Sequence, residues 1–183
     1  YLKHTAPPRK THWFTNPHSN WNTVCSGGAG VLALALGERC PESQEVLQRV
    51  ETGIKPFFES TGQDGGWPEG VGYWNFGMRY GFLYLPSHET ATGQIHPLLE
   101  RPGTAATLRF PLLFTPNGVP CGFGDSNKFA PLPFHLLAAR RLNRPEVEAE
   151  LVERFQTPQS TARPVQGNKA AHSENPELAI LWR

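Results

Sequence analysis

The segment from Gly62 to Tyr80 constrains this chain more than any other part of its sequence. It reads GQDGGWPEGVGYWNFGMRY and holds six glycines and two tryptophans in nineteen residues. Each glycine weakens regular structure and frees the backbone. The pattern predicts a glycine-rich loop to about Gly70 and an aromatic helix from about Val71 to Leu85, which Pro86 ends. Aromatic rings beside a bare backbone suit a flat, hydroxyl-rich ligand, and they equally suit a turn followed by a core helix.

Composition excludes several classes of protein. The chain has 183 residues, enough for one domain with a core of reasonable size. Its formal charge of +1 lacks the basic excess typical of nucleic-acid-binding proteins, and no apolar run approaches the length of a membrane span. The three cysteines are widely spaced and match neither a zinc site nor a disulfide framework. We therefore predict no nucleic-acid partner, no membrane span, and no metal or other cofactor.

The remaining apolar patterns are helical, and none is typical of a strand. Prolines make residues 1–21 an extended lead-in. Residues 23–36 are small and apolar nearly all round, as in a buried helix. Further helices are expected within 41–58, 94–114, 132–142 and 146–155, whereas the polar segment 156–173 is expected to be mobile. The sequence therefore predicts an all-α fold, with residues 1–183 as a single helical domain.

The number of helices and the position of the loops favour a particular architecture. Six or so antiparallel helices with functional loops at one end are typical of an (α/α) toroid or part of one. A second glycine-rich loop, residues 119–128, is expected at the same end as the loop before Gly70. The chain begins without an initiator or signal peptide and stops on the apolar run ELAILW. We therefore expect an incomplete toroid with more chain in the parent protein.

Two motifs together resemble the heparinase II/III-like polysaccharide lyases and their alginate-lyase relatives. NWNTVCSGGAGVLALAL, residues 20–36, is similar to the asparagine–tryptophan helix start of that family. DGGWPEGVGYWNFG, residues 64–77, is similar to its glycine-rich loop and tyrosine-bearing helix. FGDSN at 123–127 and the closing ELAILW are weaker matches. The resemblance implies a helical toroid followed by a β-sandwich domain, an active site in the cleft between them, and a periplasmic or secreted location.

The resemblance also implies cleavage of a uronic-acid-containing polysaccharide by β-elimination. Such a lyase removes the C5 proton beside the carboxylate and expels the sugar linked at C4. Because that proton is weakly acidic, hydrogen bonds must first neutralise the carboxylate, and a tyrosine or histidine then takes the proton. Tyr73 follows His18 by 55 residues, a separation comparable to that in the family. We predict Tyr73 as the general acid/base, His18 and Asn20 as groups that hold the carboxylate, and Asn16 behind them.

Four more residues are candidates for binding the acidic polysaccharide. Trp67 and Trp74 suit stacking on sugar rings. Glu69 can contact the substrate, and Arg79 can pair with a uronate or a sulfate. Structural alternatives stay open for all of the candidates: a helix cap for Asn20, a helix-dipole contact for Glu69, core packing for the aromatic rings, a backbone bond for the histidine, and a surface salt bridge for the arginine.

Two other classes of function also stay open. The chain can be a non-catalytic carbohydrate-binding or scaffold toroid, which would bind an oligouronate without releasing an unsaturated product. Residues 63–67 resemble the glutamine–tryptophan repeat of triterpene cyclases, another toroid family, but this chain has one repeat and no acidic catalytic motif. Because the β-domain histidine of the lyase family has no counterpart here, residues 1–183 alone are expected to be weak or inactive as an enzyme.

Overall fold

A computed structural model describes residues 1–5, 13–124 and 129–156 of the chain. Every element in these ranges is helical and none is a strand, which confirms the all-α class. The longer helices are α2 (Trp21–Leu36), α3 (Ser43–Ser60), α4 (Val71–Thr92), α7 (Pro133–Arg141) and α8 (Pro145–Gln156). The short elements are α1 (Leu2–Thr5), η1 (Trp13–Thr15), η2 (Gly37–Arg39), η3 (Pro97–Glu100), α5 (Pro102–Ala106), η4 (Thr107–Arg109), α6 (Phe110–Leu113) and η5 (Pro116–Gly118).

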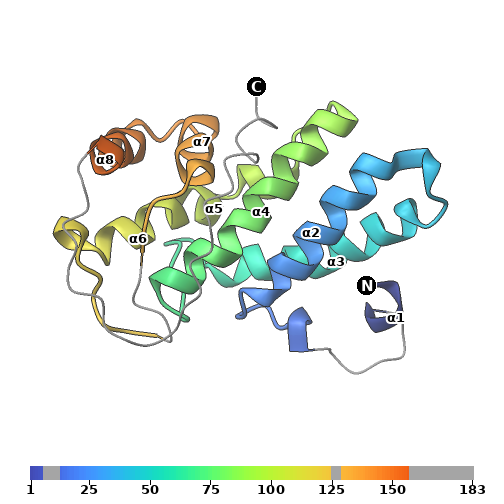
Figure 1. Ribbon diagram of the computed structural model, residues 1–183, viewed down its shortest axis with the longest axis horizontal. Coiled ribbons are helices and arrows are strands. Elements are labelled where there is room, and N and C mark those ends of the chain that lie inside the picture. Colours follow the sequence, from blue (N-terminus) through green and yellow to red (C-terminus); the bar gives the residue numbers. More distant parts are fainter. Residues whose placement is uncertain (6–12, 125–128, 157–183) are drawn as a thin grey trace.

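Helix α2 packs against both α3 and α4 (Figure 1). A short connection through η2 reverses the chain, so α3 runs antiparallel to α2. Helix α4 runs parallel to α2, because Asn20 lies against Gly77 and, further along both helices, Gly30 lies against Tyr84. A toroid requires such parallel contact between alternate helices, and the closure of a ring stays a prediction.

Glycines allow α2 and α4 to approach closely. A Cβ atom on Gly27 would lie 2.6 Å from the carbonyl oxygen of Tyr80. Nearer the start of both helices, the Thr23 hydroxyl donates to the carbonyl oxygen of Gly77 over 2.8 Å. The small residues that predicted a buried helix over 23–36 therefore form a contact surface. The helix is not buried all round, however, because Leu32 is 59% exposed.

Large aromatic side chains fill the space between α3, α4 and the segment that follows α4. Phe57 and Phe58 of α3 and Phe82 of α4 are buried. Trp74 is fully buried, and its Nε1 donates to Thr107 Oγ1 over 2.8 Å, which ties α4 to η4. The hairpin of α7 and α8 lies beside this core, with α7 against α4 (Figure 1).

Helix α4 continues to Thr92, so the prediction that Pro86 ends it is wrong. A proline inside a helix removes one backbone hydrogen bond and costs about 3 kcal/mol. Contacts beyond the proline oppose this cost: Arg141 of α7 pairs with Glu89 over 2.8 Å. The helix ends at Gly93, which adopts the left-handed conformation with φ of 70°.

The lead-in over residues 1–21 is only partly extended. Helix α1 and the 3₁₀ turn η1 both fall within it, because a proline restricts only itself and the residue before it. Of the segment 156–173, which the sequence predicts to be mobile, only Gln156 belongs to the described residues, as the last residue of α8.

Gly27 and Gly28 provide a matched test of the contact between α2 and α4. Gly27→Ala places a methyl group against the Tyr80 backbone, whereas nothing lies within 4 Å of a Cβ on Gly28. Gly27→Ala should lower the free energy of unfolding by about 1–3 kcal/mol through overpacking. Gly28→Ala should raise it by up to about 1 kcal/mol, because alanine is the better helix former. Urea unfolding measures both, and equal effects would contradict the close approach.

His135 of α7 is a buried histidine with one hydrogen bond. Its Nε2 lies 2.8 Å from the carbonyl oxygen of Leu108, and because a carbonyl only accepts, Nε2 carries the proton. Its Nδ1 is buried and has no hydrogen-bond partner within residues 1–5, 13–124 and 129–156. Burial lowers the pKa of His135 to about 4, although the hydrogen bond to Leu108 opposes the shift. The ring is therefore neutral near pH 7.

This shift predicts a loss of stability in mild acid. At pH values between the ordinary pKa of histidine and about 4, His135 is protonated in the unfolded chain but neutral in the folded chain. As the pH falls from 7 to 4, wild type should lose on the order of 3 kcal/mol of unfolding free energy relative to His135→Gln, which keeps a donor but does not titrate. Urea unfolding at several pH values tests this, and parallel profiles would show that the ring is accessible to protons.

Candidate functional site

The starts of α2 and α4 bring the predicted catalytic residues into one region. A Cβ on Gly77 would lie 3.1 Å from both Cα and Cβ of Asn20. Glu69, just before α4, accepts the backbone N–H of Asn20 through Oε2 over 2.7 Å. Tyr73 lies between these two contacts, one turn before Gly77 on the same face of α4. Tyr73 is thus one helical turn from the point where Asn20 contacts α4, although more than fifty residues separate the two in sequence.

The two glycine-rich loops meet at the start of α4. A Cβ on Gly124 would lie 2.5 Å from the carbonyl oxygen of Glu69 and 2.6 Å from the nitrogen of Gly70. Gly70 precedes α4 with φ of 91°, a conformation that favours glycine. The expectation that the loops lie together is confirmed for their described residues. Residues 125–128 of the second loop lie outside the described part of the chain.

Asn20 does not cap α2 with its side chain. Among the described residues, its buried Oδ1 has no hydrogen-bond partner, and neither do the buried Oδ1 and Nδ2 of Asn22. A buried polar atom without a partner costs about 1–3 kcal/mol, a cost that a ligand or water can offset. The helix-cap reading of Asn20 is therefore wrong for its side chain.

Asn16 and His18 lie on an exposed turn before α2. The Asn16 Oδ1 accepts the backbone N–H of His18 over 3.0 Å, the geometry of an Asx turn. The Pro17 carbonyl accepts the Ser60 hydroxyl over 2.9 Å, which fastens this turn to the end of α3. His18 is exposed, whereas Asn16 has a structural bond that shapes the turn.

Both predicted stacking tryptophans are core residues, so the sugar-stacking prediction is wrong for them. Trp74 is fully buried and bonded to Thr107. Trp67 is 2% exposed and packs on Phe57 with ring centroids 4.7 Å apart. A sugar stacks on a ring face that reaches solvent, and neither tryptophan offers one.

Glu69 and Arg79 have different settings. Glu69 places its carboxylate at the positive end of α2, where it accepts an amide N–H and stabilises the helix. Arg79 lies over two rings, with its Cζ 5.4 Å from the centroid of Phe76 and 4.9 Å from that of Tyr80. Its Nη2 donates to the Tyr80 hydroxyl over 3.2 Å, and its buried Nε has no partner in the part of the chain that the structure describes. Glu69 therefore makes the helix-dipole contact that was its structural alternative. Arg79 forms no salt bridge with a described residue, so its structural alternative is not supported.

Four aromatic residues that were not predicted from the sequence lie near the starts of α2 and α4. Trp13 is 59% exposed and Trp21 is 44% exposed, and their rings meet edge to face at 5.4 Å. The ring centroids of Phe76 and Trp21 are 6.3 Å apart, and those of Phe76 and Tyr80 are 5.7 Å apart. We call these four residues the aromatic strip. Tyr73, Phe76 and Tyr80 are spaced to share one face of a helix, so the sequence alone could have indicated that Phe76 and Tyr80 lie on the same side as Tyr73.

A second polar cluster joins α3 to α4 away from this region. Glu51 accepts the hydroxyl of Tyr84 and lies 2.9 Å from His96 Nε2. Burial alone would raise the pKa of Glu51, but hydrogen bonds from His96 and Tyr84 outweigh it and lower the pKa. Burial and the Glu51 carboxylate raise the pKa of Tyr84. These groups satisfy one another about 16 Å along α4 from Tyr73, so their role is structural.

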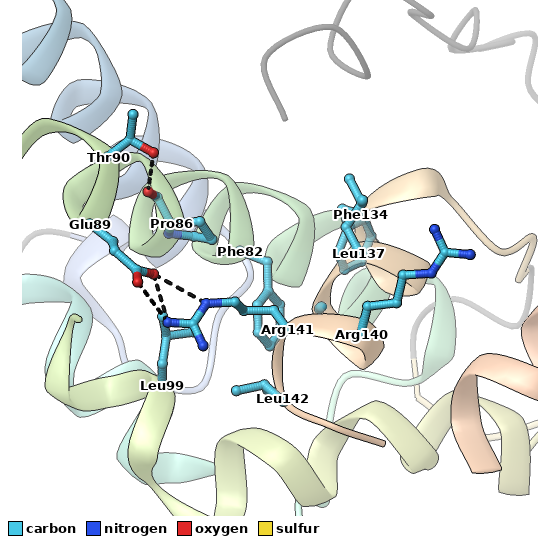
Figure 2. Close-up of a pocket in the computed structure, with 11 residues that line it drawn as sticks. Phe82, Pro86, Glu89, Thr90, Leu99, Phe134, Leu137, Arg140, Arg141 and Leu142 are labelled. Atoms are coloured by element: carbon cyan, nitrogen blue, oxygen red, sulfur yellow. Dashed lines mark hydrogen bonds and ion pairs between the residues drawn. The ribbon is translucent and has the colours of Figure 1, made fainter. Parts of the chain in front are cut away.

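A pocket of about 360 Å³ lies between the later half of α4, η3 and α7 (Figure 2). Its lining is mainly apolar: Phe82, Pro86, Leu99, Phe134, Leu137, Ala138 and Leu142. Its polar groups bond to protein atoms: Glu89 pairs with Arg141, and the Thr90 hydroxyl donates to the Pro86 carbonyl (Figure 2). Arg140 pairs with Glu148 of α8. None of the predicted site residues lines this pocket.

No known protein family and no curated protein matches this chain. The likeness to polysaccharide lyases therefore consists of the motifs alone. Within residues 1–5, 13–124 and 129–156, no three His, Cys, Asp or Glu side chains are grouped to hold a metal ion. The helices of the same ranges include none long and apolar enough to cross a membrane.

The contact between Glu69 and α2 can be tested by stability. Glu69→Ala should lower the free energy of unfolding by about 1 kcal/mol, because the Asn20 N–H loses its acceptor. Glu69→Gln keeps an acceptor and should cost less. The control is Glu38→Ala on the exposed turn η2, expected within about 0.5 kcal/mol of wild type. Urea unfolding measures the losses. Equal losses of stability in Glu69→Ala and Glu38→Ala would argue against a stabilising contact between Glu69 and the Asn20 N–H.

Proposed function

We propose that this chain is the helical part of a polysaccharide lyase that cleaves uronic-acid-containing polysaccharides by β-elimination. The observation that carries the proposal is the position of Asn20, which contacts α4 at Gly77, one turn from Tyr73. Sequence motifs far apart in the chain thus meet, with the glycine-rich loops beside them. The proposal includes an acidic polysaccharide as substrate and a toroid completed with a β-sandwich domain.

In this proposal Tyr73 exchanges the protons. The residue is half-buried, and its hydroxyl makes no hydrogen bond within the described part of the chain, so the hydroxyl has no protein partner there that a substrate would have to displace. The deprotonated tyrosine takes the C5 proton, a C4=C5 double bond forms, and the C4–O bond breaks. The leaving oxygen then receives a proton from the tyrosine.

Asn20 and His18 neutralise the substrate carboxylate in this scheme. The Asn20 Nδ2 is the atom that can donate to the carboxylate, whereas its buried Oδ1, which has no partner among the described residues, can accept only from a hydroxyl of the substrate. The exposed His18 lies on the turn just before Asn20. Hydrogen-bond donors aimed at the developing charge stabilise the enolate-like transition state. Asn16 supports them by fixing the backbone of the turn.

The runner-up is a non-catalytic carbohydrate-binding or scaffold toroid. The aromatic strip favours it as much as the lyase, since binding requires the rings and not Tyr73. The two proposals differ in one product: only the lyase forms an unsaturated uronate, which absorbs ultraviolet light.

Tyr73→Phe tests the lyase directly. The substitution keeps the ring and removes only the hydroxyl, so the fold should change little. Turnover of an oligouronate by the natural full-length protein should fall by on the order of a hundredfold or more, whereas the dissociation constant should stay near that of wild type. The increase of absorbance from the unsaturated product measures the rate.

Tyr84→Phe is the matched control. It removes a tyrosine hydroxyl from the same helix, at a position bonded to Glu51 and outside the site. This variant should lose stability and keep its turnover when folded. Near-normal turnover of folded Tyr73→Phe would remove Tyr73 from the mechanism, and oligouronate binding by wild type without product would favour the scaffold.

A further inference from the structure

Arg79 differs from the other half-buried arginines of the described residues. Arg49, Arg101, Arg144 and Arg154 each pair with a glutamate. Arg79 has no carboxylate partner in this part of the chain; its guanidinium lies over Phe76 and Tyr80 and bonds the Tyr80 hydroxyl. The rings hold the positive charge in place without neutralising it. A fixed cation without a counter-charge favours an anionic ligand.

The rings around Arg79 continue the same surface toward the candidate site. The aromatic strip runs from Trp13 through Trp21 and Phe76 to Tyr80, with each ring within 6.3 Å of the next. Trp13 and Trp21 are both partly exposed, at 59% and 44%. Exposed aromatic rings suit the apolar face of a sugar ring. A protein partner with a flat apolar surface would suit the rings less well as an explanation, because it would leave Arg79 without an anionic group to pair with.

We propose that the aromatic strip and Arg79 form a subsite for a second acidic sugar, next to the sugar that reacts at Tyr73. This inference rests on the proposed function and adds a specificity determinant to it. Arg79 lies six residues after Tyr73, about 9 Å along the helix axis, and we assign it to a neighbouring unit because of this offset. The guanidinium pairs with the carboxylate of that unit, and Trp21 packs against its ring.

The binding experiment uses the full-length protein with Tyr73→Phe, which keeps the probe intact. The probes are uronate hexasaccharides from alginate and from a glycosaminoglycan, and the same hexasaccharides with their carboxyls reduced to alcohols. Arg79→Gln should weaken binding of the acidic probes by about ten- to hundredfold and leave binding of the reduced probes unchanged. Trp21→Ala should weaken binding of both kinds. Isothermal titration calorimetry measures the dissociation constants.

Arg39→Gln is the matched charge control, because Arg39 is exposed at the far end of α2 and bonds only backbone carbonyls. Circular dichroism confirms that each variant is folded. Equal effects of Arg79→Gln and Arg39→Gln, or equal affinity for acidic and reduced probes, would overturn the subsite. Tighter binding of a single-stranded oligonucleotide, which also uses aromatic rings and arginine, would overturn it as well.

Activity separates the subsite from the lyase. If wild type binds acidic probes through Arg79 but forms no unsaturated product, the subsite stands and the lyase proposal fails. If wild type forms the product and Arg79→Gln leaves its KM unchanged, the lyase stands and the subsite fails. A raised KM with little change in kcat supports both.

Discussion

The close contact between α2 and α4 is the interaction on which the candidate site depends. Gly27 lies against the Tyr80 carbonyl and Gly77 against Asn20, so no side chain separates the two helices there. Asn20 and Trp21 at the start of α2 therefore reach the first turns of α4 directly. Displacements of about 1 Å at a catalytic site can cost about a hundredfold in rate, so a wider spacing here would matter to chemistry as well as to packing.

This closeness opposes helix propensity. A glycine inside a helix costs about 1 kcal/mol relative to alanine, and both helices carry several. Gly27, Gly30, Gly77 and Gly81 each face a neighbour that a Cβ would crowd, so packing explains them. Gly28 faces open space, and nothing in the structure explains it. Burial of α2 and α4 against their neighbours offsets the helix-propensity cost of these glycines. Burial also offsets the cost of Pro86 inside α4.

Local features of this fold could be predicted from the sequence, and the orientation of side chains could not. The start of α4 follows from glycines that permit the left-handed backbone at Gly70, and the helical class follows from the apolar periodicity. Trp21 and Trp74 belong to equally unusual motifs, yet one is exposed and the other is buried. Their roles depend on which helix face meets a neighbour. Glu69 is similar, because its partner lies 49 residues away.

The charges at the start of α2 limit how a uronate can be held. The positive end of a helix attracts anions, but Glu69 already occupies the Asn20 N–H. A substrate carboxylate at that end would meet the Glu69 carboxylate, and like charges at short range repel. Arg79 is about 9 Å further along α4 and suits a neighbouring sugar. In the proposed lyase, the reacting carboxylate must therefore lie away from the Glu69 carboxylate and receive hydrogen bonds from side-chain donors, the role proposed for Asn20 Nδ2 and His18.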